Sequence, residues 1–279
     1  MRKIVLDSFC KLPQKYTQAN EIEVLDIPFY INDEKLTFDA YSKKDYLDVN
    51  ESHFVIEEDY VKEEDVQEFF EQNLFGENEV LYLCTVDSKS VNYLAIKQVV
   101  EALKVKYPQT FEVIFLQSTN PAVKFLIQDA FEQKNSKDRL FVVKRNLEKK
   151  MQKYSAFILL DDKNIIAKYN ERPTMALAFG VKPIYNLNLN GNFELFCRED
   201  GLTNGINKIY SIIEDLKKNN ASIDIVITYA KSAKHAELLE RLFVKNLNEK
   251  VKIDKFFMDP MLINEFGLGA IIVSAQAVI

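Results

Sequence analysis

The chain has 279 residues, of which only 7 are glycine, about a third of the average glycine usage. This scarcity disfavours a glycine-rich phosphate loop, a collagen-like tract and a Gly/Ser linker. Hydrophobic residues make up 47% of the chain and charged residues 28%, the balance of an ordinary globular protein with a sizeable core. The net charge of −6 repels phosphate backbones, so nucleic acid is not an expected partner.

The few cysteines and histidines limit the possible chemistry. Cys10, Cys84 and Cys197 lie far apart and form no C-x-x-C pair, so neither a zinc site nor a disulfide framework is indicated. The two histidines, His53 and His235, exclude a His-rich metal site, and we expect no metal and no cofactor. The chain starts directly in an apolar strand without a signal-peptide pattern, and no apolar run approaches the length of a membrane span. We therefore expect a cytoplasmic protein that does not cross a membrane.

In the first half, apolar runs typical of buried strands alternate with helical patterns. The segment from 32 to 64 is polar and acidic without a clear period, which predicts an irregular excursion. Strands are predicted over residues 3–6, 23–30, 79–85 and 111–116, and helices from residue 63 and over 91–106. This alternation favours an α/β domain over residues 1–154, with helices on the faces of a mostly parallel sheet.

The second half predicts a different architecture. Two strands, 155–160 and 165–168, are expected on either side of a polar turn, and a hairpin is expected around Gly191. Helices are predicted over 206–218 and 232–247, and further strands over 223–229, 252–258 and 270–277. This mixture predicts an α+β domain with a mixed sheet over residues 155–279.

Polar turns follow three of the strands predicted in the first half. Asp7 and Ser8 close the first strand, residues 85–90 follow the third, and Ser118 and Thr119 follow the fourth. The carboxyl ends of parallel strands form the ligand crevice of an open α/β sheet. Hydroxyls and free amides at such turns bind small anions, but the same residues also cap helices. The pattern alone favours the helix caps.

Nucleophilic catalysis lacks a suitable base. A Ser/His/Asp arrangement needs a histidine, but His53 falls in the acidic segment and His235 falls within a charged helix. Asp7 is placed like the nucleophile of aspartate-dependent phosphatases, but Phe9 stands where their second aspartate is required. The Gly-Leu-Gly string at 267–269 precedes an apolar run and lacks the third glycine of a dinucleotide fingerprint. An enzyme in its own right is therefore the least favoured interpretation.

Several short strings, in order along the whole chain, resemble those of the DegV family of bacterial fatty-acid-binding proteins. KIVLDS at 3–8 is similar to the family's K-I-x-x-D-S opening, and LDIPF at 25–29 is similar to its V-x-V-P-L segment. FGVKPI at 179–184 is the most specific match, to L-G-I-K-P-I. Gly191 stands at the family's hairpin glycine, and GLGA at 267–270 is similar to G-P-G-A.

Several polar positions of the family's motifs are replaced. Lys89, Ser90 and Val91 stand where the family has S-G-T. Asn164 and Glu265 replace an arginine and a histidine, which in fatty acid kinase systems serve phosphoryl transfer or partner docking. The glycines of the S-G-T and G-G-R-I turns are missing as well. The departures gather where a lipid headgroup would be handled, and they leave phosphoryl transfer an open question.

The resemblance implies a DegV-like two-domain α/β fold with a Rossmann-like N-terminal sheet. It further implies a lipid-binding protein, not an enzyme, that holds one long-chain fatty acid in a buried tunnel, in a cleft between its domains. We name the residues expected near the lipid carboxylate the headgroup set: Ser8, Ser88, Lys89, Ser90 and Ser118. The implied partner is the ATP-binding subunit of a fatty acid kinase. The alternative is a ligand-free paralogue that binds another protein through the acidic segment 51–65.

Overall fold

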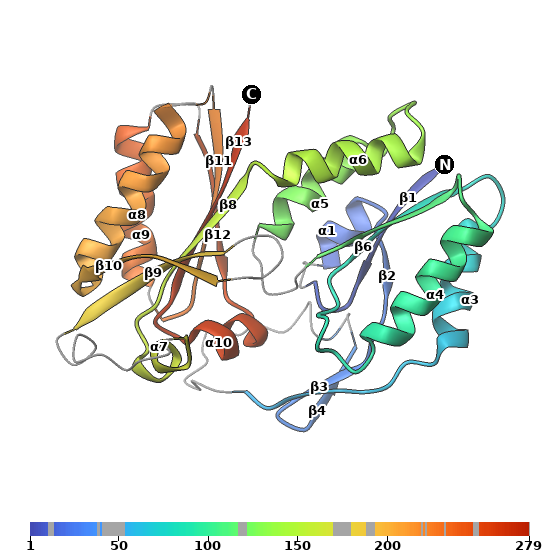
Figure 1. Ribbon diagram of the computed structural model, residues 1–279, viewed down its shortest axis with the longest axis horizontal. Helices are drawn as coiled ribbons and strands as arrows, with labels where there is room; N and C mark the ends of the chain where they lie inside the picture. The colour runs from blue at the N-terminus through green and yellow to red at the C-terminus, as the bar shows by residue number, and fades with distance from the viewer. Residues whose placement is uncertain are drawn as a thin grey trace. The chain divides into compact units, whose positions relative to one another are not determined.

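The computed structural model describes two compact units, and each is built around a main sheet of its own (Figure 1). Unit 1 consists of Met1–Asp45, Val55–Ser118 and Val123–Gln152, and unit 2 of Tyr46–Phe54, Thr119–Ala122 and Lys153–Ile279. The residues that the structure describes are 1–10, 14–37, 40, 54–116, 122–169, 180–187, 193–218, 220, 222–231, 233–247 and 251–278. The domain boundary near Tyr154 and the ligand cleft between the domains stay predictions.

A four-stranded parallel sheet forms the centre of unit 1. Its order is β2 (Glu23–Leu25), β1 (Arg2–Asp7), β6 (Glu79–Cys84) and β7 (Phe111–Phe115). The two central strands are almost entirely buried, as expected for parallel strands covered on both faces. The expected α/β class with a parallel sheet is thereby confirmed. Because the strands are parallel, β1 and β6 end at the same edge of the sheet.

Helices pack on this sheet through apolar stripes. In α3 the stripe consists of Val66, Phe70 and Leu74 at intervals of four, and the Phe70 ring lies 5.0 Å from that of Tyr82 and 5.2 Å from that of Phe111. Among the described residues, the helices of unit 1 with given bounds are α1 (Gln14–Ala19), α3 (Glu63–Leu74), α4 (Tyr93–Lys106), α5 (Val123–Glu132) and α6 (Leu140–Met151). In the described part of the chain, no helix is long and apolar enough to cross a membrane.

A smaller sheet in unit 1 falls within the segment predicted to be irregular. Its central strand β3 (Phe29–Ile31) pairs antiparallel with β4 (Glu34–Leu36) and with β5 (Ile56–Glu58). Asn32 and Asp33 form the tight turn from β3 to β4, with φ angles of 50° and 65° that these two residue types tolerate. The expectation of irregular structure over 32–64 is wrong for β4 and β5, because strands of three residues are too short to show a period.

A six-stranded mixed sheet forms the centre of unit 2, and this confirms the predicted mixed architecture. Its order is β10 (Phe193–Asp200), β9 (Val181–Leu187), β8 (Tyr154–Leu159), β13 (Ile271–Val278), β11 (Ser222–Tyr229) and β12 (Val251–Phe257). The helices are α7 (Lys163–Tyr169), α8 (Gly201–Lys218), α9 (Ala233–Asn246) and α10 (Pro260–Phe266). One face of the sheet packs against α8 and α9, where Ile225 and Val273 meet Ile209 and Phe243.

One predicted hairpin of unit 2 is confirmed and one is wrong. Strands β9 and β10 pair antiparallel as expected, while Gly191 in their connection lies outside the described residues. The strand expected over 165–168 belongs instead to the helix α7. Asp162 starts this helix, because its carboxylate accepts the N–H of Asn164 at 2.8 Å and its carbonyl accepts that of Ile166 at 2.9 Å. An aspartate cap thus outweighs the short apolar run that indicated a strand.

Candidate functional site

Asp7 closes β1 with a carboxylate that binds the end of the neighbouring strand β6. Its Oδ2 accepts the backbone N–H of Thr85 at 2.6 Å and the hydroxyl of Tyr82 at 3.0 Å. Its Oδ1 accepts the Thr85 hydroxyl and, at 3.2 Å, the N–H of Phe9. These four bonds fix the carboxyl ends of two parallel strands side by side. This is the edge at which open α/β sheets bind ligands.

Burial controls the protonation of the groups around Asp7. It raises the pKa of Asp7 from 3.8 to about 6, because the loss of water outweighs the hydrogen bonds from Thr85, Tyr82 and Phe9. Burial also raises the pKa of Tyr82 and that of the Cys84 thiol, and the negative charge of Asp7 adds to both shifts. Asp7 is therefore a structural carboxylate whose oxygens are already occupied, and Cys84 is an unreactive thiol.

Ser8 is fully buried, and the main chain uses its hydroxyl. The Ser8 Oγ donates to the carbonyl of Ile27 at 2.7 Å and accepts the N–H of Ile27 at 2.9 Å. The backbone N–H of Ser8 donates to the carbonyl of Leu25 at 3.1 Å. A ligand carboxylate needs a donated proton, and the Ser8 hydroxyl proton points to Ile27 instead. Ser8 thus holds the segment after β2 against β1, which is neither a helix cap nor an open anion contact.

The turn between β6 and α4 presents three more members of the headgroup set. Ser88 and Lys89 are exposed, and the N–H of Lys89 donates to the Asp87 carboxylate at 2.8 Å. Ser90 is half-buried and follows them in the same turn. The structure therefore brings residues 88–90 to the edge of the sheet that Asp7 fixes. The fifth member, Ser118, lies outside the described residues.

Ser90 and Asn92 bind a carboxylate of the chain itself, that of Glu58 at the end of β5. The Ser90 hydroxyl donates to Glu58 Oε2, and the Asn92 side-chain amide donates to the same oxygen at 3.3 Å. Asn92 also donates to the Asp59 carbonyl at 2.8 Å and accepts the N–H of Val61 at 3.0 Å. Sequence reasoning missed Asn92 and Glu58, although an asparagine directly before a helix is a recognisable cap signal. This turn can therefore bind a carboxylate with neutral donors.

The Gly-Leu-Gly turn of unit 2 is explained by close packing. A Cβ atom on Gly267 would lie 3.0 Å from the Cβ of Asp162, and one on Gly269 would lie 2.9 Å from the Cβ of Asp161. Gly267 also has a φ of 80°, a conformation that favours glycine. Close packing therefore explains both glycines of this turn, and the backbone conformation adds a second reason at Gly267.

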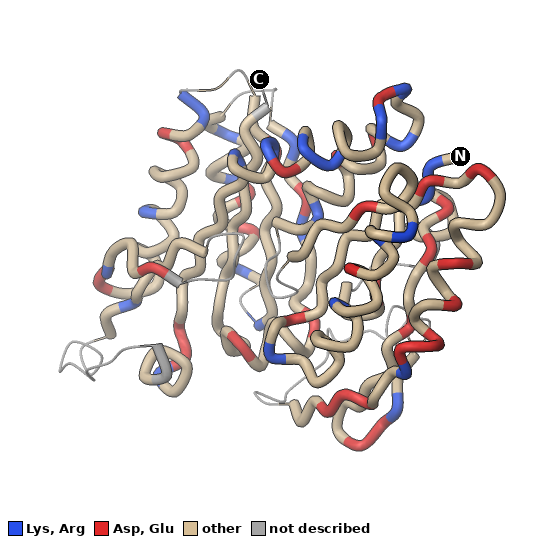
Figure 2. The backbone as a smooth tube through the Cα atoms, turned by 45° about the vertical axis from the view of Figure 1, so that its right-hand side comes forward, with Lys and Arg blue, Asp and Glu red and all other residues tan. Residues whose placement is uncertain are grey.

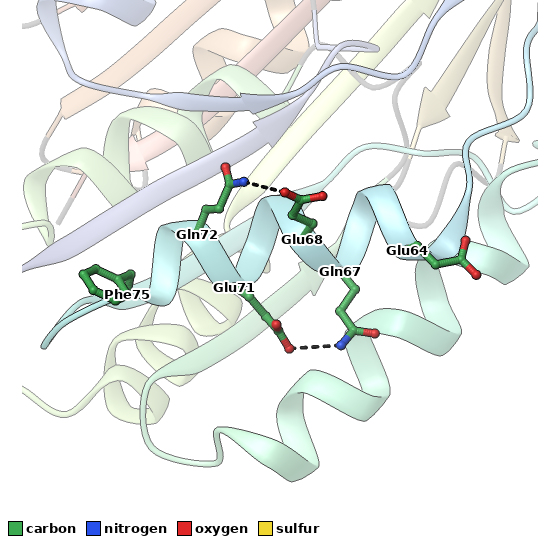
Figure 3. A pocket seen from close by; sticks show the side chains of 6 residues that line it. All are labelled: Glu64, Gln67, Glu68, Glu71, Gln72 and Phe75. Carbon is green, nitrogen blue, oxygen red and sulfur yellow. Dashed lines mark hydrogen bonds between the residues drawn. The ribbon is translucent and has the colours of Figure 1, made fainter.

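The outer side of α3 carries a hollow of about 660 Å³ (Figure 3), and acidic residues recur along this helix (Figure 2). Its lining is formed by Glu64, Gln67, Glu68, Glu71, Gln72 and Phe75. Gln67 donates to Glu71 and Gln72 to Glu68, each at 3.0 Å. Phe75 is 84% exposed. Acidic and amide side chains beside one exposed aromatic ring suit a protein partner better than an acyl chain.

Cofactor ligands are sparse in the described part of the chain. Within it, no group of three or more His, Cys, Asp or Glu side chains could hold a metal ion. His235 is half-buried on α9, while His53 lies outside the described residues. Cys10 and Cys84 are buried and do not belong to a disulfide. The site that the geometry favours is the turn after β6, where Ser90 and Asn92 donate to a carboxylate.

Together, these features define a class: two-unit α/β proteins that combine a parallel sheet, a six-stranded mixed sheet and an anion-binding turn. The family model described as "Uncharacterised protein, DegV family COG1307" matches residues 1–277. The chain belongs to the DegV family, and the resemblance noted in its motifs is confirmed.

Solved structures of DegV proteins have the same fold. The fatty-acid-binding DegV family protein of Thermus thermophilus has a TM-score of 0.72 at 16% identity, with 99% of each chain covered. DegV of Bacillus subtilis, described as a fatty acid binding protein, gives the same TM-score, identity and coverage. A DegV family protein of Eubacterium eligens, loaded with heptadecanoic acid, has a TM-score of 0.70 at 11% identity, with 100% of both chains covered. No match was found among curated proteins.

Proposed function

We propose that this protein binds a long-chain fatty acid and is a binding protein, not an enzyme. The observation that carries the proposal is the family membership over residues 1–277. The full-length similarity to a DegV structure loaded with heptadecanoic acid supports it. The described residues add a carboxylate-binding turn at the ligand edge of the parallel sheet. A fatty acid has one carboxylate and one apolar chain, and this protein would hold both.

The carboxylate end of the proposal rests on the turn that already binds Glu58. Ser90 and Asn92 donate to that side chain, and a lipid carboxylate needs donors of the same kind. We propose that the lipid carboxylate displaces Glu58 from Ser90. The exposed ammonium of Lys89 would balance the incoming negative charge. Glu58 is then a built-in competitor that fills the site while the lipid is absent.

The other members of the headgroup set have different roles in this proposal. Ser88 is exposed in the same turn and is free to rotate toward the ligand. Ser8 supports the sheet edge through Ile27 and makes no direct bond to the lipid. We propose Ser118 as a further contact of the lipid carboxylate, because the family resemblance implies it.

The acyl chain would supply most of the affinity. Burial of each CH₂ group contributes about 0.8 kcal/mol, so a chain of roughly sixteen carbons outweighs the contacts of one carboxylate. The polar turn then mainly orients the ligand. Replacement of the family's headgroup residues is compatible with binding for this reason. The chain would lie in a tunnel between the two domains of a cytoplasmic protein.

Presentation of the lipid to a fatty acid kinase subunit is the second part of the proposal. Phosphoryl transfer needs placed cations or donors for the developing charge. Asn164 and Glu265 stand where the family's motifs have arginine and histidine. We therefore expect little or no acyl phosphate when the protein is incubated with a bacterial fatty acid kinase subunit, ATP and a fatty acid. Rapid acyl phosphate formation would show that other residues supply the charge.

Native mass spectrometry tests lipid binding directly. Protein purified from expressing cells is expected to carry the mass of one fatty acid under non-denaturing conditions and to lose it on denaturation. Protein stripped of lipid is expected to take up added heptadecanoic acid in a one-to-one ratio. The proposal fails if no acyl mass is found and no added fatty acid is bound.

The acidic hollow on α3 supports a second candidate, a protein-interaction module without lipid. Glu64, Glu68 and the exposed Phe75 ring would fit a basic partner segment with an apolar anchor. A partner that co-purifies with lipid-free protein and is lost from the variant Phe75→Ala would favour this candidate. Lipid uptake that is equal in wild type and Phe75→Ala, without any partner, would favour the first.

A further inference from the structure

The outer face of α6 carries a row of side chains at intervals of four residues. Phe141, Arg145 and Lys149 are exposed, and the Phe141 ring begins the row. Residues four apart lie on one face of a helix, so the ring and the two cations are neighbours. Aromatic and arginine side chains are enriched at protein interfaces. We name these three residues the basic row.

The other two cations of α6 differ from the basic row, because acidic residues already pair with them. The Lys144 Nζ lies 3.7 Å from the Glu112 carboxylate on β7, and the Lys150 Nζ lies 2.6 Å from the Asp129 carboxylate on α5. Glu148 pairs with Lys144 as well, at 3.4 Å. Among the described side chains, no ion pair involves a cation of the basic row. Its positive charge therefore remains available to a partner.

The outer face of α3 has the opposite charge and also ends in an exposed aromatic ring. Glu64, Glu68, Glu71 and Phe75 line its hollow, and Figure 3 shows Glu64 at one end of this row and the Phe75 ring at the other. We name these four residues the acidic row. Glu71 pairs with Lys106 of α4 at 2.7 Å. In the part of the chain that the structure describes, Glu64 and Glu68 are exposed and no cation pairs with them.

The two rows match in spacing when their helices run antiparallel. An α-helix rises about 1.5 Å per residue. Measured from the ring of its own row, Arg145 lies about 6 Å and Lys149 about 12 Å along the axis of α6. On α3, Glu71 lies about 6 Å and Glu68 about 10.5 Å from the ring. With the two rings side by side, each cation meets one carboxylate, whereas a parallel arrangement would separate the rings by the length of a row.

One copy of the chain cannot bring its own two rows together. In unit 1, α3 packs against α4, and α6 packs against α5. Figure 1 shows α3 and α4 on one side of the parallel sheet, and α5 and α6 on the other. Because both rows lie on the outer faces of their helices, they point away from each other. The acidic row can therefore meet only the basic row of a second copy.

We propose that α6 of one copy docks antiparallel on α3 of a second copy, with Phe141 packed against Phe75 and the basic row on the acidic row. The proposal goes beyond lipid binding and does not depend on a bound ligand. The contact joins two different surfaces, so each added copy leaves one row open at either end, and chains or rings form instead of a closed pair. A single pair of helices forms a small interface, so the association is weak and sensitive to salt.

Sedimentation velocity of the full chain, at about 10 to 500 µM protein in low and high salt, tests the proposal. The average mass of the wild type is expected to rise with concentration beyond that of a dimer in low salt, and to return to that of the monomer in high salt. The variants R145E/K149E and E64K/E68K are each expected to stay monomeric. An equal mixture of the two is expected to associate, because one variant keeps the acidic row and the other keeps the basic row.

The matched control is K234E/K245E, which reverses two exposed lysines of α9 and changes the net charge as much as R145E/K149E does. It is expected to associate as the wild type does. The proposal is overturned if the wild type stays monomeric at every concentration, if a row variant associates as the wild type does, if the mixture stays monomeric, or if the control loses association equally. Fatty acid binding stands in each of these cases, and a monomeric wild type would leave the hollow on α3 to a different protein.

Discussion

Asp7 and Thr85 are 78 positions apart in the sequence, yet the Asp7 carboxylate accepts both the backbone N–H and the hydroxyl of Thr85. This double contact joins the ends of β1 and β6 in a fully buried setting. The polar turn that follows Thr85 carries Ser90, the donor to Glu58. The geometry of the candidate carboxylate site therefore depends on a buried carboxylate whose oxygens are bonded within the chain.

The raised pKa of Asp7 predicts how stability depends on pH. The folded protein holds this proton up to about pH 6, whereas the unfolded chain loses it near 3.8. The stability that Asp7 contributes is therefore complete below about pH 4 and is lost as the pH rises through 6, a change of roughly 3 kcal/mol.

The variant Asp7→Asn removes this titration. Its amide also turns an NH₂ group toward donors that the carboxylate accepted, so it is expected to be less stable than the wild type. Urea unfolding between pH 4 and pH 7 measures the free energy of unfolding of both proteins. The difference between wild type and Asp7→Asn is expected to be largest at pH 4 and smaller at pH 7. A difference that grows with rising pH would contradict the pKa assigned to Asp7.

The exchange of two hydrogen bonds between Ser8 and Ile27 predicts a stability effect of Ser8→Ala. The substitution leaves the N–H and the carbonyl of Ile27 buried without their partner, at a cost of about 2–3 kcal/mol. Chemical denaturation is the measurement. Ser88→Ala, at an exposed position of the turn, is the control and is expected to change stability by less than about 0.5 kcal/mol. Equal effects of the two substitutions would refute the bracing role of Ser8.

Displacement of Glu58 by the lipid predicts that Glu58→Gln raises fatty acid affinity. The glutamine keeps an acceptor for Ser90 but removes the charge that competes with the lipid carboxylate, so the Kd is expected to fall by about threefold to tenfold. Displacement of a fluorescent fatty acid measures this change. Glu57→Gln removes an equal charge from the exposed neighbouring position of β5. If both substitutions shift the Kd equally, the effect is one of net charge and the displacement model is wrong.

The hydrogen bonds of the Arg2 side chain predict that unit 1 requires a guanidinium at this position. Its Nε and Nη2 donate to the Glu79 carboxylate at 3.0 and 2.8 Å, and its other donors reach the carbonyls of Gln133 at 2.8 Å and Asp138 at 2.6 Å. A lysine cannot serve this planar set of acceptors. Arg2→Lys is therefore expected to destabilise unit 1 by about 2–3 kcal/mol in urea unfolding. Arg145→Lys, at an exposed position of α6, supplies the control and is expected to be neutral.

Much of the fold could be predicted because buried positions appear in the sequence as local patterns of apolar residues. The alternation of apolar strand runs with helical patterns predicted the parallel sheet that contains β1 and β6, and a helix was predicted from residue 63, where α3 begins. The strand expected at 165–168 failed because the Asp162 cap, at the start of the segment, decides its conformation. The strands β4 and β5 failed because each has three residues, which is fewer than a pattern needs.

The sequence by itself determined the apolar periods, the polar turns at the strand ends and the family to which the chain belongs. It did not determine the partner of each hydroxyl. Ser8 bonds to Ile27, 19 positions away, and Ser90 bonds to Glu58, 32 positions away. Tertiary structure decides these roles because a hydrogen bond depends on distance in space, which no local pattern of residues records.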